Sequence, residues 1–259
     1  MPDLYAVIGN PISHSKSPFI HTEFARQTKQ AIQYSALLAP LDDFVPTIKK
    51  FREQGGKGMN ITVPFKLEAF EQSTQLTERA KQAQAVNTFK FDGDQLLSDN
   101  TDGAGLTRDI TLNLDTPIAT KRILLMGAGG AARGVILPLL EHQPAVLAIA
   151  NRTTKKAQDL KQQFDDHGQI MAGNYADFID ENFDIIINAT SASLNDELPQ
   201  LPAGLFNNNS LAYDLMYSNE PTRFLTFAKQ QGVKHLADGV GMLVEQAAES
   251  FFIWRGIRP

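Results

Sequence analysis

Residues 122–133, RILLMGAGGAAR, carry the most specific local signal in this chain. The consecutive apolar residues of this stretch are typical of a parallel strand that is covered on both faces. The glycines that follow fit the pattern Gly-x-Gly-x-x-Ala, and a helical pattern comes directly after them. Glycine at the first two positions permits a tight turn and lets a pyrophosphate approach the backbone N–H groups at the start of a helix. The stretch therefore predicts a dinucleotide-binding unit, with an ordinary tight turn between strand and helix as the alternative.

The alternation of strand and helix continues after this stretch. We expect strands at 146–150, 184–188 and 210–215, and helices at 155–164 and 221–231. This alternation of strands and helices predicts a doubly wound parallel sheet. A last helix, at about 241–254, is apolar on much of its circumference and has to pack against another element.

A second α/β pattern precedes the glycine-rich stretch. It has expected strands at 5–9, 33–38, 59–63, 86–91 and 95–98, and expected helices at 19–30, 42–54 and 105–113. A helical pattern is also expected from the end of the third strand to about residue 83. The last two of these strands flank Asp92-Gly93-Asp94, which indicates a hairpin turn. A length of 259 residues favours two domains over a single large α/β domain.

Composition excludes several classes of function. The 24 Lys and Arg residues against 29 Asp and Glu residues give a net charge of −5, so the totals supply no basic surface for nucleic acid. The absence of cysteine excludes disulfides, thiolate metal sites and cysteine nucleophiles. The five histidines show no paired metal spacing, so we expect no metal. No apolar run is long enough for a membrane span, and no secretory signal is visible at the start.

The residues after the second strand of the dinucleotide unit select the cofactor. Arg152 follows Gly127 by 25 residues, and positions 151–156 hold three cations and no acid. An acid at this place would bind a ribose 2′-OH, whereas cations suit a 2′-phosphate. The sequence thus favours NADP over NAD, with a solvated first helical turn as the alternative.

A candidate substrate site lies in the first α/β pattern. Asn60 and Thr62 point to the same face of their expected strand, and Lys66 follows shortly after its end. Such groups suit a polyhydroxylated ligand. The alternative is an exposed edge strand with a solvated Lys66, which would show the same pattern. Ser17 before Pro18 could simply be a helix N-cap, and residues 99–103 could be only a turn and cap.

A series of ordered motifs resembles the shikimate dehydrogenase family. These motifs are GNPISHSKSP (9–18), NITVPFK (60–66), AVNT (85–88), DNTDG (99–103), GAGGA (127–131), NRT (151–153), NAT (188–190) and DGVGMLV (238–244). The resemblance runs from residue 5 to about residue 254. It implies an N-terminal α/β substrate domain, residues 1–102 and 238–259, and an NADP-binding Rossmann domain, residues 103–237. The active site would lie in the interdomain cleft.

The resemblance also implies roles for single residues. Lys66 and Asp102 would form the catalytic pair, and Ser15 and Ser17 would hold the substrate carboxylate. The other substrate-binding residues would be Asn60, Thr62, Asn87, Tyr217 and Gln246, with Lys66 and Asp102 also in contact. The cofactor would be bound by Glu78, Gly127, Ala128, Gly129, Gly130, Ala131, Asn151, Arg152, Thr153, Lys156, Thr190, Leu215, Gly239 and Met242.

The implied reaction is the reversible NADPH-dependent reduction of 3-dehydroshikimate to shikimate. The alternatives are a quinate/shikimate dehydrogenase that uses NAD and a catalytically silent NADP-binding sensor. The expected partner is a small-molecule substrate, with neither nucleic acid nor membrane, in a cytoplasmic monomer or homodimer.

Overall fold

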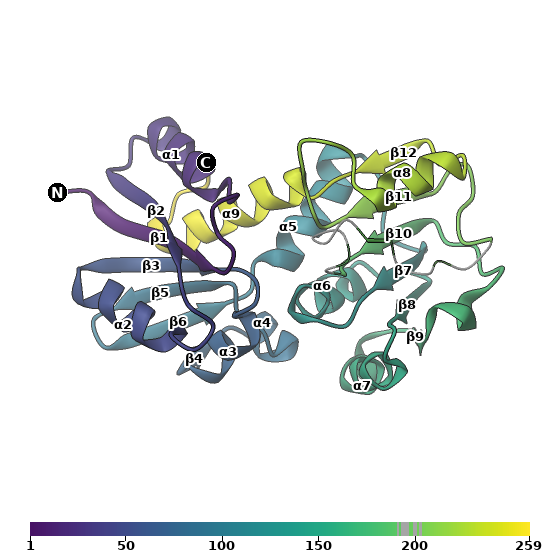
Figure 1. The fold of residues 1–259 in the computed structure, drawn as a ribbon, viewed down its shortest axis with the longest axis horizontal. Coiled ribbons are helices and arrows are strands. Elements are labelled where there is room, and N and C mark those ends of the chain that lie inside the picture. Colours follow the sequence, from purple (N-terminus) through teal and green to yellow (C-terminus); the bar gives the residue numbers. More distant parts are fainter. Residues whose placement is uncertain (191, 193–196, 199–200, 202–203) are drawn as a thin grey trace. The chain divides into compact units, whose positions relative to one another are not determined.

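The computed structural model describes residues 1–190, 192, 197–198, 201 and 204–259. The chain forms two compact units, one of residues 1–105 and 243–259, the other of residues 106–242 (Figure 1). The chain leaves the first unit within helix α5 (Asp102–Arg108) and returns to it within helix α9 (Val240–Arg255). Each unit is built around its own six-stranded sheet. The expected α/β fold class is confirmed.

The sheet of the first unit is mixed. Its order is β2-β1-β3-β5-β6-β4, in which β1 runs parallel to β2 and β3, while β5 is antiparallel to β3 and β6. The strands are β1 (Asp3–Gly9), β2 (Ile32–Leu38), β3 (Gly56–Ile61), β4 (Gln75–Leu76), β5 (Thr88–Asp92) and β6 (Gln95–Asp99). The helices are α1 (Ser17–Thr28), α2 (Phe44–Glu53), α3 (Lys66–Glu71) and α4 (Glu78–Ala83). The expected hairpin joins β5 to β6 at Gly93.

Alternation along β3 separates an apolar face from a polar one. Met59 and Ile61 pack with Phe44 and Phe65 from the helical side of the sheet. Asn60 points the other way, since successive side chains of a strand face opposite sides of the sheet. This side of the sheet is the one that carries the candidate site.

The sheet of the second unit is entirely parallel, in the order β12-β11-β10-β7-β8-β9. Its strands are β7 (Arg122–Met126), β8 (Val146–Ala150), β9 (Ile170–Gly173), β10 (Ile185–Asn188), β11 (Leu211–Asp214) and β12 (His235–Ala237). The helical segments are α6 (Gly130–Glu141), α7 (Thr154–Phe164), α8 (Arg223–Gln230), the π-helical turn η1 (Asp109–Asn113), and the short turns η2 (Asp165–His167) and η3 (Tyr175–Phe178).

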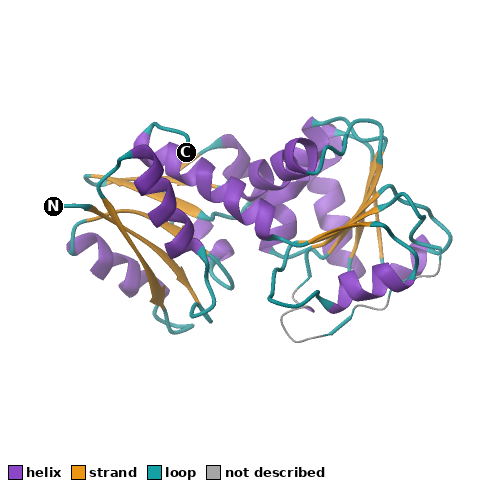
Figure 2. Ribbon diagram, turned by 90° about the horizontal axis from the view of Figure 1, so that it is seen from above, coloured by secondary structure: helices purple, strands orange, loops and turns teal. Residues whose placement is uncertain are grey.

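Alternate residues of β7 bury into cores on opposite faces of this sheet. Ile123 and Leu125 join the core formed with α6 and α7, whereas Leu124 and Met126 join the core formed with α8. Figure 2 shows the strands of this unit edge-on between helices. The doubly wound arrangement expected from the continuous apolar strands is therefore confirmed.

The structure differs from the predicted elements in four strands. Strand β3 begins at Gly56 instead of residue 59, and Gly58 lets Trp254 pack closely, because a Cβ there would lie 2.5 Å from the indole nitrogen. Strands β4, β9 and β12 were not predicted, since two to four residues give too little periodicity to recognise. Strand β4 interrupts a helical pattern that was expected to run through about residue 83. Among the described residues, no helix is both long and apolar enough to cross a membrane.

Candidate active site

Two helix starts bring Lys66 and Asp102 together. Lys66 is the first residue of α3, and Asp102 is the first residue of α5. Their side chains are 14% and 6% exposed, and Nζ of Lys66 donates to Oδ2 of Asp102 over 2.5 Å. A mostly buried ammonium beside a carboxylate is a pair able to give and take one proton.

Asn87 holds the second oxygen of the same carboxylate. Its amide nitrogen donates to Oδ1 of Asp102 over 2.8 Å and lies 3.2 Å from Oε1 of Gln246 on α9. Its amide oxygen accepts from the backbone N–H of Thr101 over 2.9 Å. The predicted residues Lys66, Asp102, Asn87 and Gln246 thus form one hydrogen-bonded group.

Asn60 belongs to the same buried polar network through hydroxyl groups. Its amide nitrogen donates to Ser250 over 2.9 Å and to Thr88 over 3.1 Å. Ser250 in turn lies 3.2 Å from the Thr101 hydroxyl. The oxygen of Asn60 accepts from the Tyr34 hydroxyl over 2.7 Å.

The loop that carries Asp102 is fixed by an ion pair. Arg79 donates to both oxygens of Asp99, each over 2.7 Å, and also pairs with Glu249 of α9 over 3.1 Å. Burial alone would raise the pKa of Asp99, but the Arg79 guanidinium holds that pKa below its usual value. The anchored Asp99 sits three residues before the candidate catalytic carboxylate.

The remaining predicted substrate residues are placed separately. Ser17 is buried and is not the N-cap of α1; the helix starts at Ser17 itself, Lys16 precedes it, and no side chain caps it. The backbone N–H of Ser17 donates to the Ser15 hydroxyl over 3.3 Å, so the two serines lie close together. Thr62 is half-buried just after β3. Tyr217 belongs to the second unit, just after β11.

The glycine-rich turn of the second unit leaves room for a ligand. Gly127 has a φ of +111°, and a Cβ there would lie 2.9 Å from the Ala189 carbonyl, so the turn itself requires glycine. Gly129 differs, since an added Cβ would meet nothing within 4 Å. The first turn of α6 has neither an acid nor a side-chain cap. An open space before an uncapped helix start fits a pyrophosphate.

The other predicted cofactor residues follow the carboxyl ends of neighbouring strands. Thr190 follows β10, Leu215 follows β11 and Gly239 follows β12, beside the glycine-rich turn after β7. Gly239 packs directly on Leu215, because a Cβ there would lie 2.1 Å from the Leu215 carbonyl oxygen. This sheet edge, where the strand order reverses, is where doubly wound folds bind nucleotides.

Cations follow strand β8 at the same edge. Arg152, Thr153 and Lys156 are exposed, and Asn151 donates to the Thr153 carbonyl over 2.9 Å. Within the described ranges, neither Arg152 nor Lys156 forms an ion pair, whereas Lys155 is paired with Asp159 over 2.5 Å. Two unpaired cations suit the 2′-phosphate of NADP.

Two further predicted cofactor residues, Met242 and Glu78, form hydrogen bonds within the protein. The backbone N–H of Met242 donates to the Tyr213 hydroxyl over 3.2 Å, and Tyr213 donates to buried Asp109 over 2.6 Å. Glu78 belongs to the first unit, at the start of α4, and accepts from Gln82 over 2.8 Å.

The sequence did not reveal four polar residues that complete the network. Thr88 and Thr101 lie inside motifs that the sequence displays, so their position could have suggested them. Tyr34 and Ser250 lie in otherwise ordinary strand and helix patterns. A serine on an apolar helix was the one available signal for Ser250.

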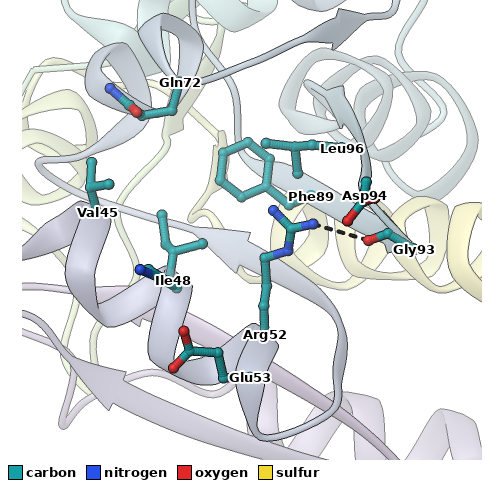
Figure 3. A pocket seen from close by; sticks show the side chains of 10 residues that line it. Val45, Ile48, Arg52, Glu53, Gln72, Phe89, Gly93, Asp94 and Leu96 are labelled. Carbon is teal, nitrogen blue, oxygen red and sulfur yellow. Dashed lines mark hydrogen bonds between the residues drawn. The ribbon is translucent and has the colours of Figure 1, made fainter.

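A cavity elsewhere on the first unit is separate from this network. It has a volume of about 490 Å³ and lies between α2 and the β5–β6 hairpin (Figure 3). Ile48, Phe89 and Leu96 are among its apolar lining residues, and Arg52 reaches across to the Gly93 carbonyl over 3.0 Å. No predicted site residue lines it.

Comparison with known proteins gives one consistent result. Three family models match: "Shikimate dehydrogenase substrate binding domain" at residues 7–89, "Shikimate / quinate 5-dehydrogenase" at 111–195, and "Shikimate 5'-dehydrogenase C-terminal domain" at 239–259. The chain is 62% identical to a protein from Nitrosospira multiformis named shikimate dehydrogenase (NADP(+)), over 100% of this chain and 94% of the relative.

Solved structures agree with the sequence comparison. An Ael1 enzyme from Pseudomonas putida is 50% identical with a TM-score of 0.92, over 99% of this chain and 94% of that one. A shikimate 5-dehydrogenase from Thermus thermophilus, in complex with NADP(H) and shikimate, is 30% identical with a TM-score of 0.87, over 99% of this chain and 95% of that one.

Proposed function

This chain belongs to the shikimate dehydrogenase family, and we propose that Lys66 and Asp102 handle the proton in its reaction. The reaction is the reversible NADPH-dependent reduction of 3-dehydroshikimate to shikimate, in the shikimate pathway. The chain is therefore an NADP-dependent oxidoreductase, as its motifs predict. The alternatives, a quinate enzyme that uses NAD and a silent sensor, are not favoured.

The observation that carries the proposal is the contact between the Lys66 ammonium and the Asp102 carboxylate. When bound, NADPH supplies the hydride to the substrate ketone. Negative charge develops on the ketone oxygen as it is reduced, and a positioned ammonium stabilises this charge and delivers a proton. Such acid–base assistance contributes about 10²–10⁴-fold to a rate.

Asp102 has two tasks in this proposal. One oxygen holds Lys66 and the other holds Asn87, so the carboxylate fixes the direction of the ammonium. In the oxidation direction Lys66 has to accept the proton of the substrate hydroxyl. Asp102 stays close enough to stabilise the ammonium that then forms.

The other residues bind and orient. We assign the substrate carboxylate to the hydroxyls of Ser15 and Ser17, and the ring hydroxyls to Asn60, Thr62, Asn87 and Gln246, with Tyr217 as a further contact. The turn at 127–131 takes the pyrophosphate, and Asn151, Arg152, Thr153 and Lys156 take the adenosine end. It stays a prediction that the cofactor also contacts Glu78, Thr190, Leu215, Gly239 and Met242, and that substrate and nicotinamide meet in an interdomain cleft. The cytoplasmic location and the monomeric or homodimeric state stay predictions as well.

The test follows NADP reduction by the purified chain with shikimate, for the wild type and for Lys66→Ala. We expect kcat to fall about 100-fold or more in Lys66→Ala, while NADPH binding is unchanged. Lys57→Ala, which removes an exposed lysine from β3 of the same sheet, is the matched control and should keep the wild-type kcat. A Lys66→Ala enzyme within a few-fold of wild type would remove Lys66 from the mechanism.

A further inference from the structure

The amide of Asn60 has a defined orientation. Its nitrogen lies 3.3 Å from the backbone carbonyl of Asn87, which can only accept a hydrogen bond. The hydroxyls of Ser250 and Thr88, at 2.9 and 3.1 Å, are the other acceptors for the same nitrogen. The amide oxygen is therefore the atom that faces the Tyr34 hydroxyl, which donates to it over 2.7 Å.

Tyr34 is itself held firmly. It is 9% exposed and packs in the apolar cluster that contains Trp254. Its ring stacks on the imidazole of His21, with centroids 4.2 Å apart and planes 8° from parallel. Packing against Trp254 and His21 thus fixes the position of the phenol.

The charge state of the pair supports donation by the phenol. Burial raises the pKa of Tyr34 well above its usual value, and the neighbouring Ser17 side chain only partly opposes this rise. Burial also lowers the pKa of His21 to about 3, and the neighbouring Asn60 side chain only partly opposes this fall. At neutral pH the phenol therefore keeps its proton and the stacked imidazole is uncharged.

We propose that Tyr34 and Ser250 are positioning residues that hold Asn60 from opposite sides, so that Asn60 offers the substrate only a hydrogen-bond acceptor. Both amide hydrogens are used inside the protein, whereas the amide oxygen has a second lone pair after accepting from Tyr34. The substrate group at Asn60 must then be a donor, which a hydroxyl is and a carboxylate is not. This inference rests on the proposed contact between Asn60 and the substrate.

Removing the hydroxyl of Tyr34 or of Ser250 should weaken substrate binding without changing the rate of the chemical step. Without the phenol hydroxyl the oxygen of Asn60 loses its buried donor, and the amide is then held from its nitrogen end alone. We expect Tyr34→Phe to raise the KM for shikimate about 3- to 10-fold, with kcat within twofold and NADP affinity unchanged. Ser250→Ala should act in the same direction.

A double-mutant cycle separates this role from a merely structural one. The cycle measures the shikimate KM for wild type, Tyr34→Phe, Asn60→Ala and the double variant, with melting temperatures as a check on folding. If Tyr34 acts through Asn60, then Tyr34→Phe has no further effect on KM once Asn60 is replaced. Asn60→Ser replaces Asn60→Ala in the cycle if the alanine variant does not fold.

The control is Tyr5→Phe. Tyr5 lies in the same apolar cluster as Tyr34, but its hydroxyl contacts Arg255 at 3.4 Å instead of a site residue. Its KM should equal that of the wild type.

Three results would contradict us in different ways. An unchanged KM in Asn60→Ala would overturn the role of Asn60 in the proposed function, and this inference with it. A raised KM in Asn60→Ala beside an unchanged KM in Tyr34→Phe would overturn this inference alone. Independent, multiplying effects of the two substitutions would also overturn it, because Tyr34 would then act without Asn60.

Discussion

Asp102 accepts from Lys66 through one carboxylate oxygen and from Asn87 through the other, and the contact with Lys66 spans 2.5 Å. Both donors need an acceptor at position 102, so the two-sided contact requires a carboxylate. Because Lys66 and Asp102 each begin a helix, their backbones are held by separate elements of the first unit. The pair is therefore positioned before any ligand arrives.

Replacing Asp102 by asparagine should disable this arrangement without changing its size. An amide has one acceptor and one donor end, so either Lys66 or the Asn87 amide nitrogen would face an N–H group. We expect kcat to fall about 100-fold or more in Asp102→Asn, with NADP affinity unchanged. Steady-state kinetics with shikimate, beside a binding titration with NADPH, gives both numbers. A kcat close to wild type would mean that position 102 only needs a polar side chain.

The preference for NADP should depend on Arg152 more than on its neighbours. A charge-assisted contact to the 2′-phosphate is worth about 1.5–3 kcal/mol, so Arg152→Ala should raise the KM for NADP about 10- to 100-fold. The activity with NAD, which lacks this phosphate, should not change. The measurement is kcat/KM for both cofactors.

Lys155→Ala is the matched control for Arg152. Lys155 is a neighbouring exposed cation, but its ammonium is paired with Asp159. We expect its NADP kinetics to equal those of the wild type. If Arg152→Ala and Lys155→Ala weaken NADP binding equally, then general positive charge and not a specific contact selects the cofactor.

The candidate cofactor residues after β7 and β8 could be predicted from the strand pattern. The residues after β7 and β8 share one edge of a parallel sheet, so motifs far apart in the chain could be joined by topology alone. Lys66, Asn87 and Asp102 could be predicted for another reason, since they lie in motifs that resemble a known family.

The residues that support the site could not be predicted in this way. Ser250 and Asn60 are 190 positions apart, and their contact depends on how α9 packs on the first sheet. Side-chain packing across such a distance leaves no periodic signal in the sequence. The same holds for the stack of His21 on Tyr34, and for the Tyr213–Asp109 hydrogen bond.

The two glycines of the turn after β7 should respond differently to alanine. At Gly127, with φ at +111° and the Ala189 carbonyl 2.9 Å from an added Cβ, alanine should destabilise the fold by about 1–3 kcal/mol. At Gly129 the protein has space for a methyl group, so Gly129→Ala should keep the wild-type melting temperature.

Gly129→Ala should instead weaken cofactor binding, because the methyl group enters the space that the pyrophosphate needs. Thermal melting without ligand and titration with NADP distinguish the two effects. A Gly129→Ala variant with unchanged NADP affinity would show that the pyrophosphate does not approach this backbone.

His21 should make the protein sensitive to mild acid. Burial lowers the pKa of His21 to about 3 in the folded state, whereas a histidine in the unfolded chain has a pKa of about 6.5. Between these two values the unfolded state binds more protons, so stability is fully present above pH 6.5 and is lost as the pH falls toward 3. The loss approaches about 1.4 kcal/mol per pH unit, or about 2 kcal/mol between pH 7 and pH 5.

Urea unfolding at pH 7 and pH 5 measures this contribution. Other groups also titrate in this range, so the relevant quantity is the difference between wild type and His21→Phe, which keeps an aromatic ring against Tyr34. We expect the variant to lose about 2 kcal/mol less than the wild type on going from pH 7 to pH 5. His142→Gln, which replaces an exposed histidine, should lose as much as the wild type. An equal loss in His21→Phe and wild type would mean that the folded protein binds a proton at His21 as readily as the unfolded chain does.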